Sequence, residues 1–298
     1  MSEYNQEKLT QDVLAAFAGT SDPRLQTLMT ALVKHLHAFA REVDLTPDEW
    51  LAGMKFLTAT GQISTERRPE FILLSDTLGL SMMVVALNQV RASGGAHAVK
   101  GATPATEATV EGPFFWPGAP EMPLGADIAE GVPGEPTFYM GRVTDTNGRP
   151  LAGALLDVWS GDGDGFYDVQ LADPPTMRAR GRIRTDAEGR YWFWSIRPMY
   201  YPVPVDGPVG DMLRATKRNI NRPGHIHMMV SADGHVPVTT HVFVARSPYI
   251  DEDVVFGKRD SLVVEFEQHA PGKAPDGRVM STPYHSASYD FRLAPVPN

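Results

Sequence analysis

Two histidines, His225 and His227, stand two positions apart in segment 222–230, whose apolar and β-branched residues predict a strand. Residues i and i+2 of a strand share one face, so both imidazoles can bind the same metal ion. The same spacing at His35 and His37 lies in a helical pattern, where the two side chains point to different faces. His225 and His227 are therefore candidate metal ligands, and a metal site needs further donors.

The sequence contains no cysteine, which excludes disulfides, thiolate nucleophiles and iron–sulfur clusters. A cupin site would need a glutamate shortly after the second histidine, and residues 228–233 contain none. A zinc hydrolase would need a third histidine, for which His241 is available. An iron(II) facial triad would need a carboxylate, for which Asp157, Asp168 and Asp233 are available.

Tyrosines are another source of ligands. Tyr167 follows the glycine-rich turn 162–166, and Tyr200 and Tyr201 lie in the proline-rich segment 195–208. Both segments are predicted to be loops between strands. A single tyrosine in such a place more often packs as an amphipathic residue than binds a metal. The residue types alone therefore leave the ligand set open.

The elements that must position these side chains differ between the two halves of the chain. Residues 1 to about 105 hold 4 of the 25 prolines and 7 of the 27 glycines, and their apolar residues recur at helical spacing. Asp22 and Pro23 predict the start of one helix, and the capping box Thr46 to Glu49 predicts the next. Further helices are expected at 69–78 and 81–91, with a connector at 92–96. The apolar face of the first helix consists of Leu25, Leu28, Leu32, Leu36 and Phe39.

The second half shows turn signals at short intervals, at 145–148, 162–165, 186–189 and 233–234. Between them lie strand-like runs at 155–159, 191–196, 226–230 and 238–244. Short strands between regular turns predict an antiparallel sandwich or barrel.

Composition limits the class of protein. The chain has 298 residues with 42% hydrophobic and 21% charged residues, as in ordinary globular proteins. A net charge of -9 argues against a nucleic-acid surface, and no run of about 18 apolar residues predicts a membrane span. The N-terminal residues 1–7 do not resemble a secretory signal, so a cytoplasmic location is expected.

Four segments in order, 109–115, 157–167, 184–191 and 221–227, resemble the intradiol ring-cleaving dioxygenases, and the resemblance covers nearly the whole chain. It implies one non-haem Fe(III) ion per subunit, bound by Tyr167, Tyr201, His225 and His227. Tyr201 is preferred to Tyr200 because the second tyrosine of the family precedes the first histidine by 24 positions. The resemblance further implies that Tyr201 leaves the iron to act as a base, that Arg222 stabilises charge developing on the substrate, and that His241 forms hydrogen bonds beside the site without being a fifth ligand.

The resemblance also implies the domain organisation. A helical N-terminal dimerisation domain with its linker, residues 1–105, precedes an all-β antiparallel sandwich that carries the iron site, residues 106–298. The N-terminal helices of two subunits are expected to form a homodimer whose interface encloses a tunnel for phospholipid. The apolar helix faces alone would equally allow packing against the β domain.

Segments 72–81, 201–210 and 249–257 are similar to the branch of the family that acts on hydroxyquinol (benzene-1,2,4-triol). That branch inserts both atoms of O2 and gives 3-hydroxy-cis,cis-muconate or maleylacetate in aromatic-compound catabolism. By position, the substrate pocket is expected to be lined by Leu73, Asp76, Val110, Gly112, Pro113, Phe114, Val203, Pro204, Arg222 and Val255. Asp76 either accepts a hydrogen bond from the third hydroxyl or caps a helix.

Two positions depart from this pattern. Glu111 is more typical of the catechol branch, so catechol or a substituted catechol, giving cis,cis-muconates, is an alternative substrate. Gly224 replaces the usual alanine, with little expected effect. A different class is also open, a non-catalytic transthyretin-like β-sandwich that binds ligands. That class predicts an iron-free, colourless protein, whereas tyrosinate bound to Fe(III) absorbs visible light.

Overall fold

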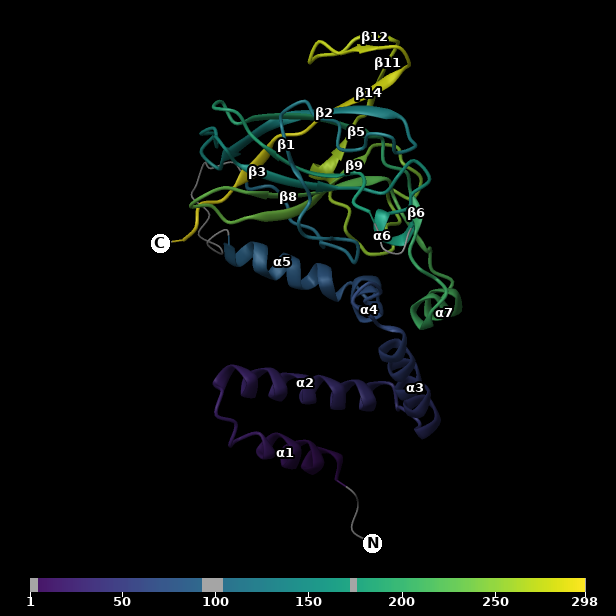
Figure 1. Cartoon of the computed structure of the whole chain (residues 1–298). Coiled ribbons are helices and arrows are strands. Elements are labelled where there is room, and N and C mark those ends of the chain that lie inside the picture. Colours follow the sequence, from purple (N-terminus) through teal and green to yellow (C-terminus); the bar gives the residue numbers. More distant parts are fainter. Residues whose placement is uncertain (1–4, 93–103, 172–175, 298) are drawn as a thin grey trace. The chain divides into compact units, whose positions relative to one another are not determined.

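The computed structural model describes residues 5–92, 104–171 and 176–297 (Figure 1). The chain divides into two compact units, residues 1–59 and 60–298. The predicted connector at 92–96 lies outside the described residues from position 93 onward.

The first unit contains α1 (Gln6–Ala16), α2 (Pro23–Glu42) and most of α3 (Pro47–Ile63). The predicted helix starts are confirmed. The carboxylate of Asp22 accepts hydrogen bonds from the backbone N–H groups of Arg24 and Leu25, at 2.8 and 3.2 Å. Thr46 and Glu49 form the reciprocal capping box, with backbone-to-side-chain distances of 2.9 and 3.3 Å.

The second unit begins with the end of α3, followed by α4 (Glu70–Thr77) and α5 (Leu80–Ala92), close to the predicted bounds. No single helix in the described part of the chain is long and apolar enough to cross a membrane. The α4 and α5 pair, bent by 74° at the break between them, meets the length and composition test only when taken together.

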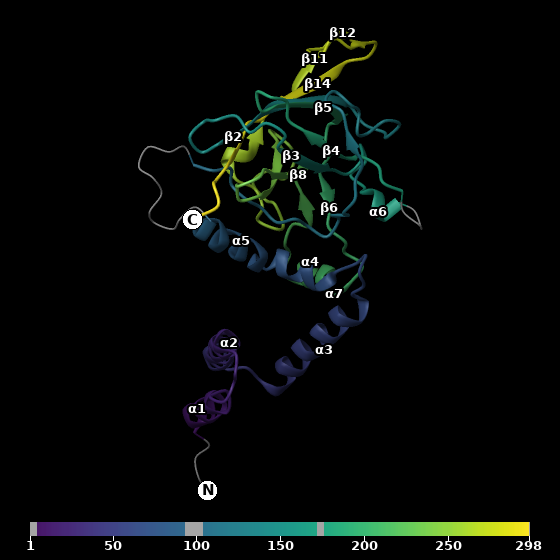
Figure 2. The ribbon, with the colours of Figure 1, turned by 60° about the vertical axis from the view of Figure 1, so that its left-hand side comes forward.

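Two sheets form the core of the second unit, as Figures 1 and 2 show. The first has the order β1-β4-β3-β8-β9-β10. Its strands are β1 (Glu121–Met122), β3 (Leu155–Trp159), β4 (Arg180–Arg184), β8 (His225–Ser231), β9 (Val238–Val244) and β10 (Val263–Val264).

The second sheet has the order β11-β14-β2-β15, with β5 paired to β2. Its strands are β2 (Pro136–Asp145), β5 (Arg190–Ile196), β11 (Glu267–His269), β14 (Tyr284–Ser288) and β15 (Phe291–Leu293). The short pairs are β6 (Tyr201–Pro202) with β7 (Asn221–Arg222), and β12 (Gly272–Lys273) with β13 (Val279–Met280). Two short helices, α6 (Asp168–Leu171) and α7 (Pro208–Ala215), interrupt the β-rich part, and a turn of 3-10 helix covers Asp260–Leu262.

A continuous apolar core joins the inward faces of the two sheets. On β8, Ile226, Met228 and Val230 point into this core, where they meet residues such as Tyr139 of β2 and Phe193 of β5. Because side chains alternate along a strand, His225 and His227 must point to the opposite face of β8. The core thus fixes which face of the sheet carries the two histidines.

The expected purely antiparallel arrangement is corrected by the structure, because both sheets are mixed. Strands β1 and β10 pair in parallel with β4 and β9, and β14 and β15 both pair in parallel with β2. Tight turns force only sequence neighbours to run antiparallel. Strands that arrive through long connections can pair in either direction, and turn signals carry no information about that choice.

Candidate metal centre

Strand register brings three aromatic side chains to the outer face of β8. His227 stands opposite Trp159 of β3 and opposite His241 of β9. Directly opposed residues on a sheet have neighbouring side chains. The ring of Trp159 stacks on the ring of His227, with centroids 4.7 Å apart and an interplanar angle of 16°. His227 is therefore held from both neighbouring strands.

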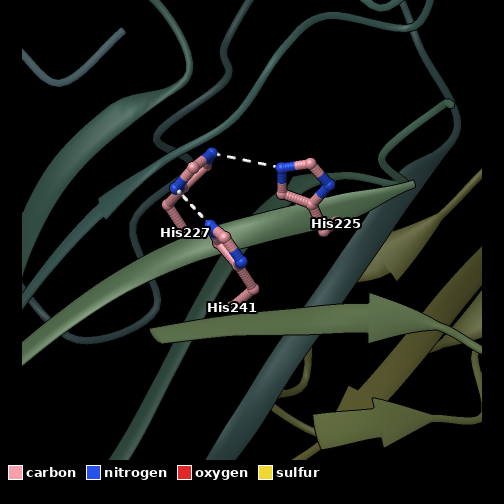
Figure 3. Close-up of side chains that lie close together, drawn as sticks. All are labelled: His225, His227 and His241. Atoms are coloured by element: carbon pink, nitrogen blue, oxygen red, sulfur yellow. Dashed lines mark hydrogen bonds between the residues drawn. The ribbon is translucent and has the colours of Figure 1, made fainter. Parts of the chain in front are cut away.

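The histidines on β8 face each other through their Nε2 atoms, which lie 3.2 Å apart (Figure 3). The Nδ1 atom of His225 lies 2.7 Å from the backbone oxygen of Pro223. A carbonyl oxygen can only accept, so Nδ1 of His225 carries the proton and Nε2 presents a lone pair. Both imidazoles are buried, and neither needs to reorient to offer Nε2 to an ion.

Tyr167 joins this cluster from the loop before α6. Its hydroxyl oxygen lies 2.9 Å from Nε2 of His227, and the residue is fully buried at 0% exposure. The next residue, Asp168, accepts a hydrogen bond of 2.6 Å from Nε of Arg180, whose Nη2 also donates to the backbone oxygen of Phe114 at 2.7 Å. The Phe114 ring stacks on Tyr167 at 4.6 Å. Through Arg180, the buried ion pair thus holds together the residue that follows Tyr167 and the residue whose ring stacks on it.

Tyr201 lies on β6, whereas the sequence predicted a loop, and its neighbour Tyr200 points elsewhere. Tyr201 is 6% exposed, with its ring centroid 5.4 Å from that of Tyr167 and 5.6 Å from that of His225. Tyr200 is 36% exposed and packs against Tyr249 instead. Of the two adjacent tyrosines, the structure brings Tyr201 to the histidines.

The protonation of these groups explains what the cluster requires. Burial raises the pKa of Tyr167 and of Tyr201, and for Tyr201 the guanidinium of Arg222 opposes part of that rise. Burial, followed by the charge of Arg222, lowers the pKa of His225 to about 3. Burial also lowers the pKa of His227. Two neutral imidazoles and two phenols that ionise only beside a cation form a donor set that fits a metal ion.

His241 lies directly behind His227. Its Nε2 atom is 2.9 Å from Nδ1 of His227, and its Nδ1 atom is 3.0 Å from the hydroxyl oxygen of Thr109. The three histidines together offer nitrogen atoms within 4.8 Å of one another. Both ring nitrogens of His241 already have partners, however, and its Nε2 faces His227 on the side away from Tyr167.

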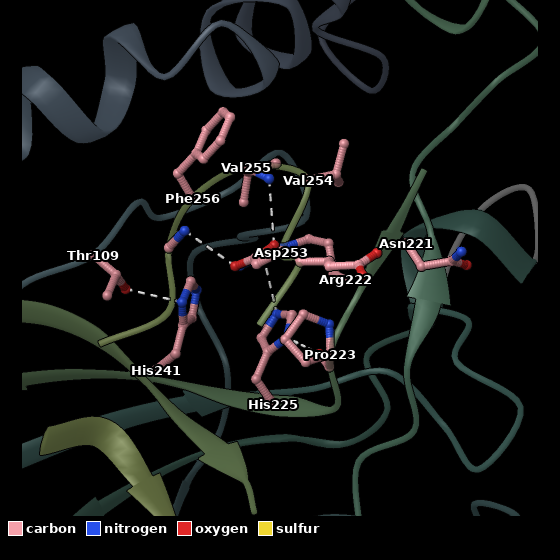
Figure 4. A network of polar contacts seen from close by, with 12 residues as sticks. Thr109, Asn221, Arg222, Pro223, His225, His241, Asp253, Val254, Val255 and Phe256 are labelled. Atoms are coloured by element: carbon pink, nitrogen blue, oxygen red, sulfur yellow. Dashed lines mark hydrogen bonds and ion pairs between the residues drawn. The ribbon is translucent and has the colours of Figure 1, made fainter. Parts of the chain in front are cut away.

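Arg222 and Asp253 form a buried ion pair beside His225 (Figure 4). The Nε and Nη2 atoms of Arg222 donate to the two carboxylate oxygens of Asp253, at 3.0 and 3.2 Å. Its Nη1 atom lies 3.1 Å from Nε2 of His225. Burial alone would raise the pKa of Asp253, but the charge and hydrogen bonds of Arg222 lower it below its usual value. The carboxylate is therefore ionised.

A cavity of about 40 Å³ is lined in part by Phe114, whose ring stacks on Tyr167. Four predicted pocket residues line it: Leu73, Pro113, Phe114 and Pro204. The sequence did not indicate the rest of its wall, which consists of Arg67, Arg68, Pro69 and Glu70. Arg68 donates to both oxygens of Asp206, at 2.8 and 2.7 Å, and contacts Glu70 at 3.2 Å.

The other predicted pocket residues lie outside this wall. Asp76, Val110, Val203 and Val255 are buried, and a Cβ atom on Gly112 would lie 3.4 Å from Cε1 of His227. Burial raises the pKa of Asp76. Glu111, in contrast, is exposed.

Sequence reasoning missed Asp253, Thr109 and the roles of Trp159 and Arg180. Asp253 sits in an acidic run, 251–253, that resembles an ordinary solvated surface segment. No local pattern distinguishes its buried carboxylate from the exposed ones beside it.

Comparison with known proteins supports this site. Residues 110–295 match the family model described as "Dioxygenase", and residues 22–95 match "Catechol dioxygenase N terminus". The chain is 48% identical to hydroxyquinol 1,2-dioxygenase of Nocardioides simplex over 295 residues, covering 99% of this chain and 97% of that protein. It is 39% identical to catechol 1,2-dioxygenase of Candida albicans, covering 97% and 92%.

Among solved structures, hydroxyquinol 1,2-dioxygenase of Pseudomonas putida DLL-E4 superimposes with a TM-score of 0.86 at 42% identity, covering 97% of this chain and 98% of that one. A helical N-terminal region followed by a β-rich part with a buried histidine and tyrosine cluster is thus the architecture of a ring-cleaving dioxygenase. The chain belongs to the intradiol ring-cleaving dioxygenase family. Enzymes of this family use a non-haem iron, which agrees with the donor set described above.

Proposed function

We propose that this protein inserts both atoms of O2 into hydroxyquinol and opens the ring between the two adjacent hydroxyl-bearing carbons. The product is 3-hydroxy-cis,cis-muconate, or its keto form maleylacetate. The observation that carries this proposal is the position of Nε2 of His227, which lies 3.2 Å from Nε2 of His225 and 2.9 Å from the Tyr167 hydroxyl, with Tyr201 packed beside Tyr167. The similarity to hydroxyquinol 1,2-dioxygenases supports the choice of substrate.

The proposed ligands of one Fe(III) ion per subunit are Tyr167, Tyr201, His225 and His227. Phenolate oxygens are hard donors that favour the oxidised ion, and the positive charge would offset the rise that burial causes in the pKa of both phenols. Ferric iron would bind the substrate diol and draw electron density from it, which makes the ring reactive toward O2. His241 is proposed to hold His227 in the orientation that presents Nε2.

The residues of the chain then have separate tasks. Tyr201 is the proposed base, because its phenolate can accept a proton from a substrate hydroxyl. Arg222 supplies a fixed positive charge next to His225, where it can stabilise negative charge that develops on the substrate. Leu73, Pro113, Phe114 and Pro204 form one apolar side of the small cavity, against which the edge of an aromatic ring could pack. These four and the other predicted lining residues, Asp76, Val110, Gly112, Val203 and Val255, are proposed to contact the substrate.

Asp76 provides a physical basis for preferring the triol. Its carboxyl is buried, and a buried acceptor gains from a partner that a catechol lacks. The alternative substrate is catechol or a substituted catechol, which the exposed Glu111 favours by its resemblance to the catechol branch.

We further propose a homodimer formed through the N-terminal helices. The apolar face of α2 is exposed in the single chain, with Leu36 at 55% and Phe39 at 54% exposure. A phospholipid in a tunnel at this interface, a cytoplasmic location and a boundary near residue 105 between the helical and catalytic domains stay predictions. The two family models, which end at residue 95 and begin at residue 110, support that boundary.

Oxygen uptake by the iron-loaded protein tests the proposed function. With hydroxyquinol, one O2 should be consumed per molecule of substrate, and both atoms of labelled O2 should appear in the ring-opened acid. Faster turnover of catechol than of hydroxyquinol would show that the preferred substrate is the diol and not the triol. No uptake with either substrate by an iron-containing protein would contradict the proposed function.

A further inference from the structure

Asp253 makes four polar contacts while almost fully buried. Its two oxygens accept hydrogen bonds from Arg222, at 3.0 and 3.2 Å, and from the backbone N–H groups of Val255 and Gly257, at 3.3 and 3.0 Å. The side chains of Arg222 and Asp253 are 4% and 2% exposed. Each carboxylate oxygen thus accepts one hydrogen bond from the guanidinium and one from a backbone N–H group of the loop 253–257 (Figure 4).

The pair sets the direction of the guanidinium. With Nε and Nη2 held by the carboxylate, the planar fork has one orientation left, in which Nη1 reaches Nε2 of His225 at 3.1 Å. Arg222 also stands opposite Tyr201 in the β6–β7 register. The guanidinium therefore lies beside His225, a proposed iron ligand, and comes from the strand that pairs with Tyr201, the proposed base.

The loop is shaped around this pair. A Cβ atom on Gly257 would lie 3.1 Å from Nη2 of Arg222 and 3.1 Å from Oδ2 of Asp253. A side chain at position 257 would therefore push on both members of the ion pair, and they would have to shift by a few tenths of an ångström. Val255, a predicted wall of the substrate pocket, is anchored by the same carboxylate through its own N–H group.

From these contacts we infer that Asp253 is a positioning residue for ring cleavage, acting through Arg222 and not by touching the substrate. The inference rests on the proposed function, since it assigns a task to the same site. Without the carboxylate, the buried guanidinium loses its partner and turns away from His225 toward other acceptors. Its charge would then no longer be preorganised where the substrate becomes negative.

The test is Asp253→Asn, which keeps the shape of the side chain and removes its charge. We expect kcat with the iron-loaded protein to fall by about 10- to 100-fold, with little change in KM, because the lost interaction acts on the transition state. Iron content and the visible absorption band should persist, since no proposed ligand is altered. The matched control is Asp145→Asn, because Asp145 is also buried and pairs with an arginine and two backbone N–H groups, but on the β2 turn. Its kcat should stay at the wild-type value.

A double-mutant cycle with Arg222→Gln separates positioning from a general structural role. If Asp253 acts through Arg222, the double variant Arg222→Gln/Asp253→Asn loses no more activity than Arg222→Gln alone. Losses that multiply, or an Asp253→Asn variant with wild-type kcat, would overturn the inference. If Asp253→Asn does not fold, Gly257→Ala takes its place, since it disturbs the pair without removing a charge. That variant should keep its colour and lose kcat, and unchanged kcat would again overturn the inference.

Failure of the proposed function would look different. A wild-type protein without bound iron or without oxygen uptake contradicts the function itself. The inference about Asp253 is judged on the ratio between variant and wild-type rates.

Discussion

His241 and His227 lie opposite each other on β9 and β8, with Nε2 of the first 2.9 Å from Nδ1 of the second. If Nε2 of His227 binds a metal ion, Nδ1 of His227 must carry the ring proton. Nδ1 then donates a hydrogen bond to Nε2 of His241. His241 in turn can donate from Nδ1 to the hydroxyl of Thr109, 3.0 Å away. These contacts fix the tautomer of His227, a proposed ligand. They come from His241 on β9 and, through His241, from Thr109.

Removing this contact should weaken iron binding. His241→Phe leaves Nδ1 of His227 buried without a partner, and loss of such outer contacts lowers metal affinity by about 10- to 100-fold. Iron release to a competing chelator measures the change. His235→Ala, at a partly buried histidine on the turn between β8 and β9, away from the ligands, serves as the control. Equal iron retention in wild type and His241→Phe would show that His241 does not support the site.

The adjacent tyrosines provide a second test. Tyr201→Phe removes a proposed ligand and base, so the visible band should shift and kcat should fall by at least about 100-fold. Tyr200→Phe should leave both almost unchanged, because Tyr200 is directed toward Tyr249. Absorption spectra and oxygen uptake of the two variants decide the matter. Similar effects at the two positions would refute the assignment of Tyr201.

Gly224 should tolerate substitution by alanine less well than the sequence suggested. A Cβ atom there would lie 2.5 Å from the backbone oxygen of Pro198, so Gly224→Ala must shift the backbone just before His225. We predict a loss of about 1–3 kcal/mol in the free energy of unfolding, as for other overpacked sites. Gly53→Ala in α3, where no atom lies within 4 Å, is the control and should not destabilise the protein. Denaturant unfolding compares the two, and an unchanged midpoint for Gly224→Ala would contradict the close contact.

If the exposed apolar face of α2 forms the dimer interface, a charged side chain placed on that face should prevent dimerisation. Leu32→Glu places a carboxylate in the centre of that face, where Leu32 is half-exposed, and should convert the proposed dimer to a monomer. Sedimentation measures the mass. Lys34→Glu, two positions along the same helix, should leave the mass unchanged. A dimer that survives Leu32→Glu would place the interface on another surface.

Local signals made part of this structure predictable. Asp22 with Pro23 and Thr46 with Glu49 mark helix starts through contacts within four residues, and both helices form as predicted. The strand face shared by His225 and His227 follows from alternation alone.

The remaining features depend on contacts between distant residues. Asp253 pairs with Arg222 across 31 positions, and no sequence pattern indicates which of the neighbouring acids is buried. The parallel pairing of β14 with β2 joins residues near 285 and 137, and no turn sequence sets its direction. The identity of the second tyrosine likewise came from resemblance and not from the residues themselves.

The visible absorption spectrum of the purified wild-type protein, recorded with its metal content, tests the central claim most directly. Iron bound by Tyr167 and Tyr201 predicts a red to brown protein with about one iron per subunit and a broad charge-transfer band that changes when hydroxyquinol is added without oxygen. A colourless protein, whether free of metal or loaded with zinc, would contradict the proposed iron site.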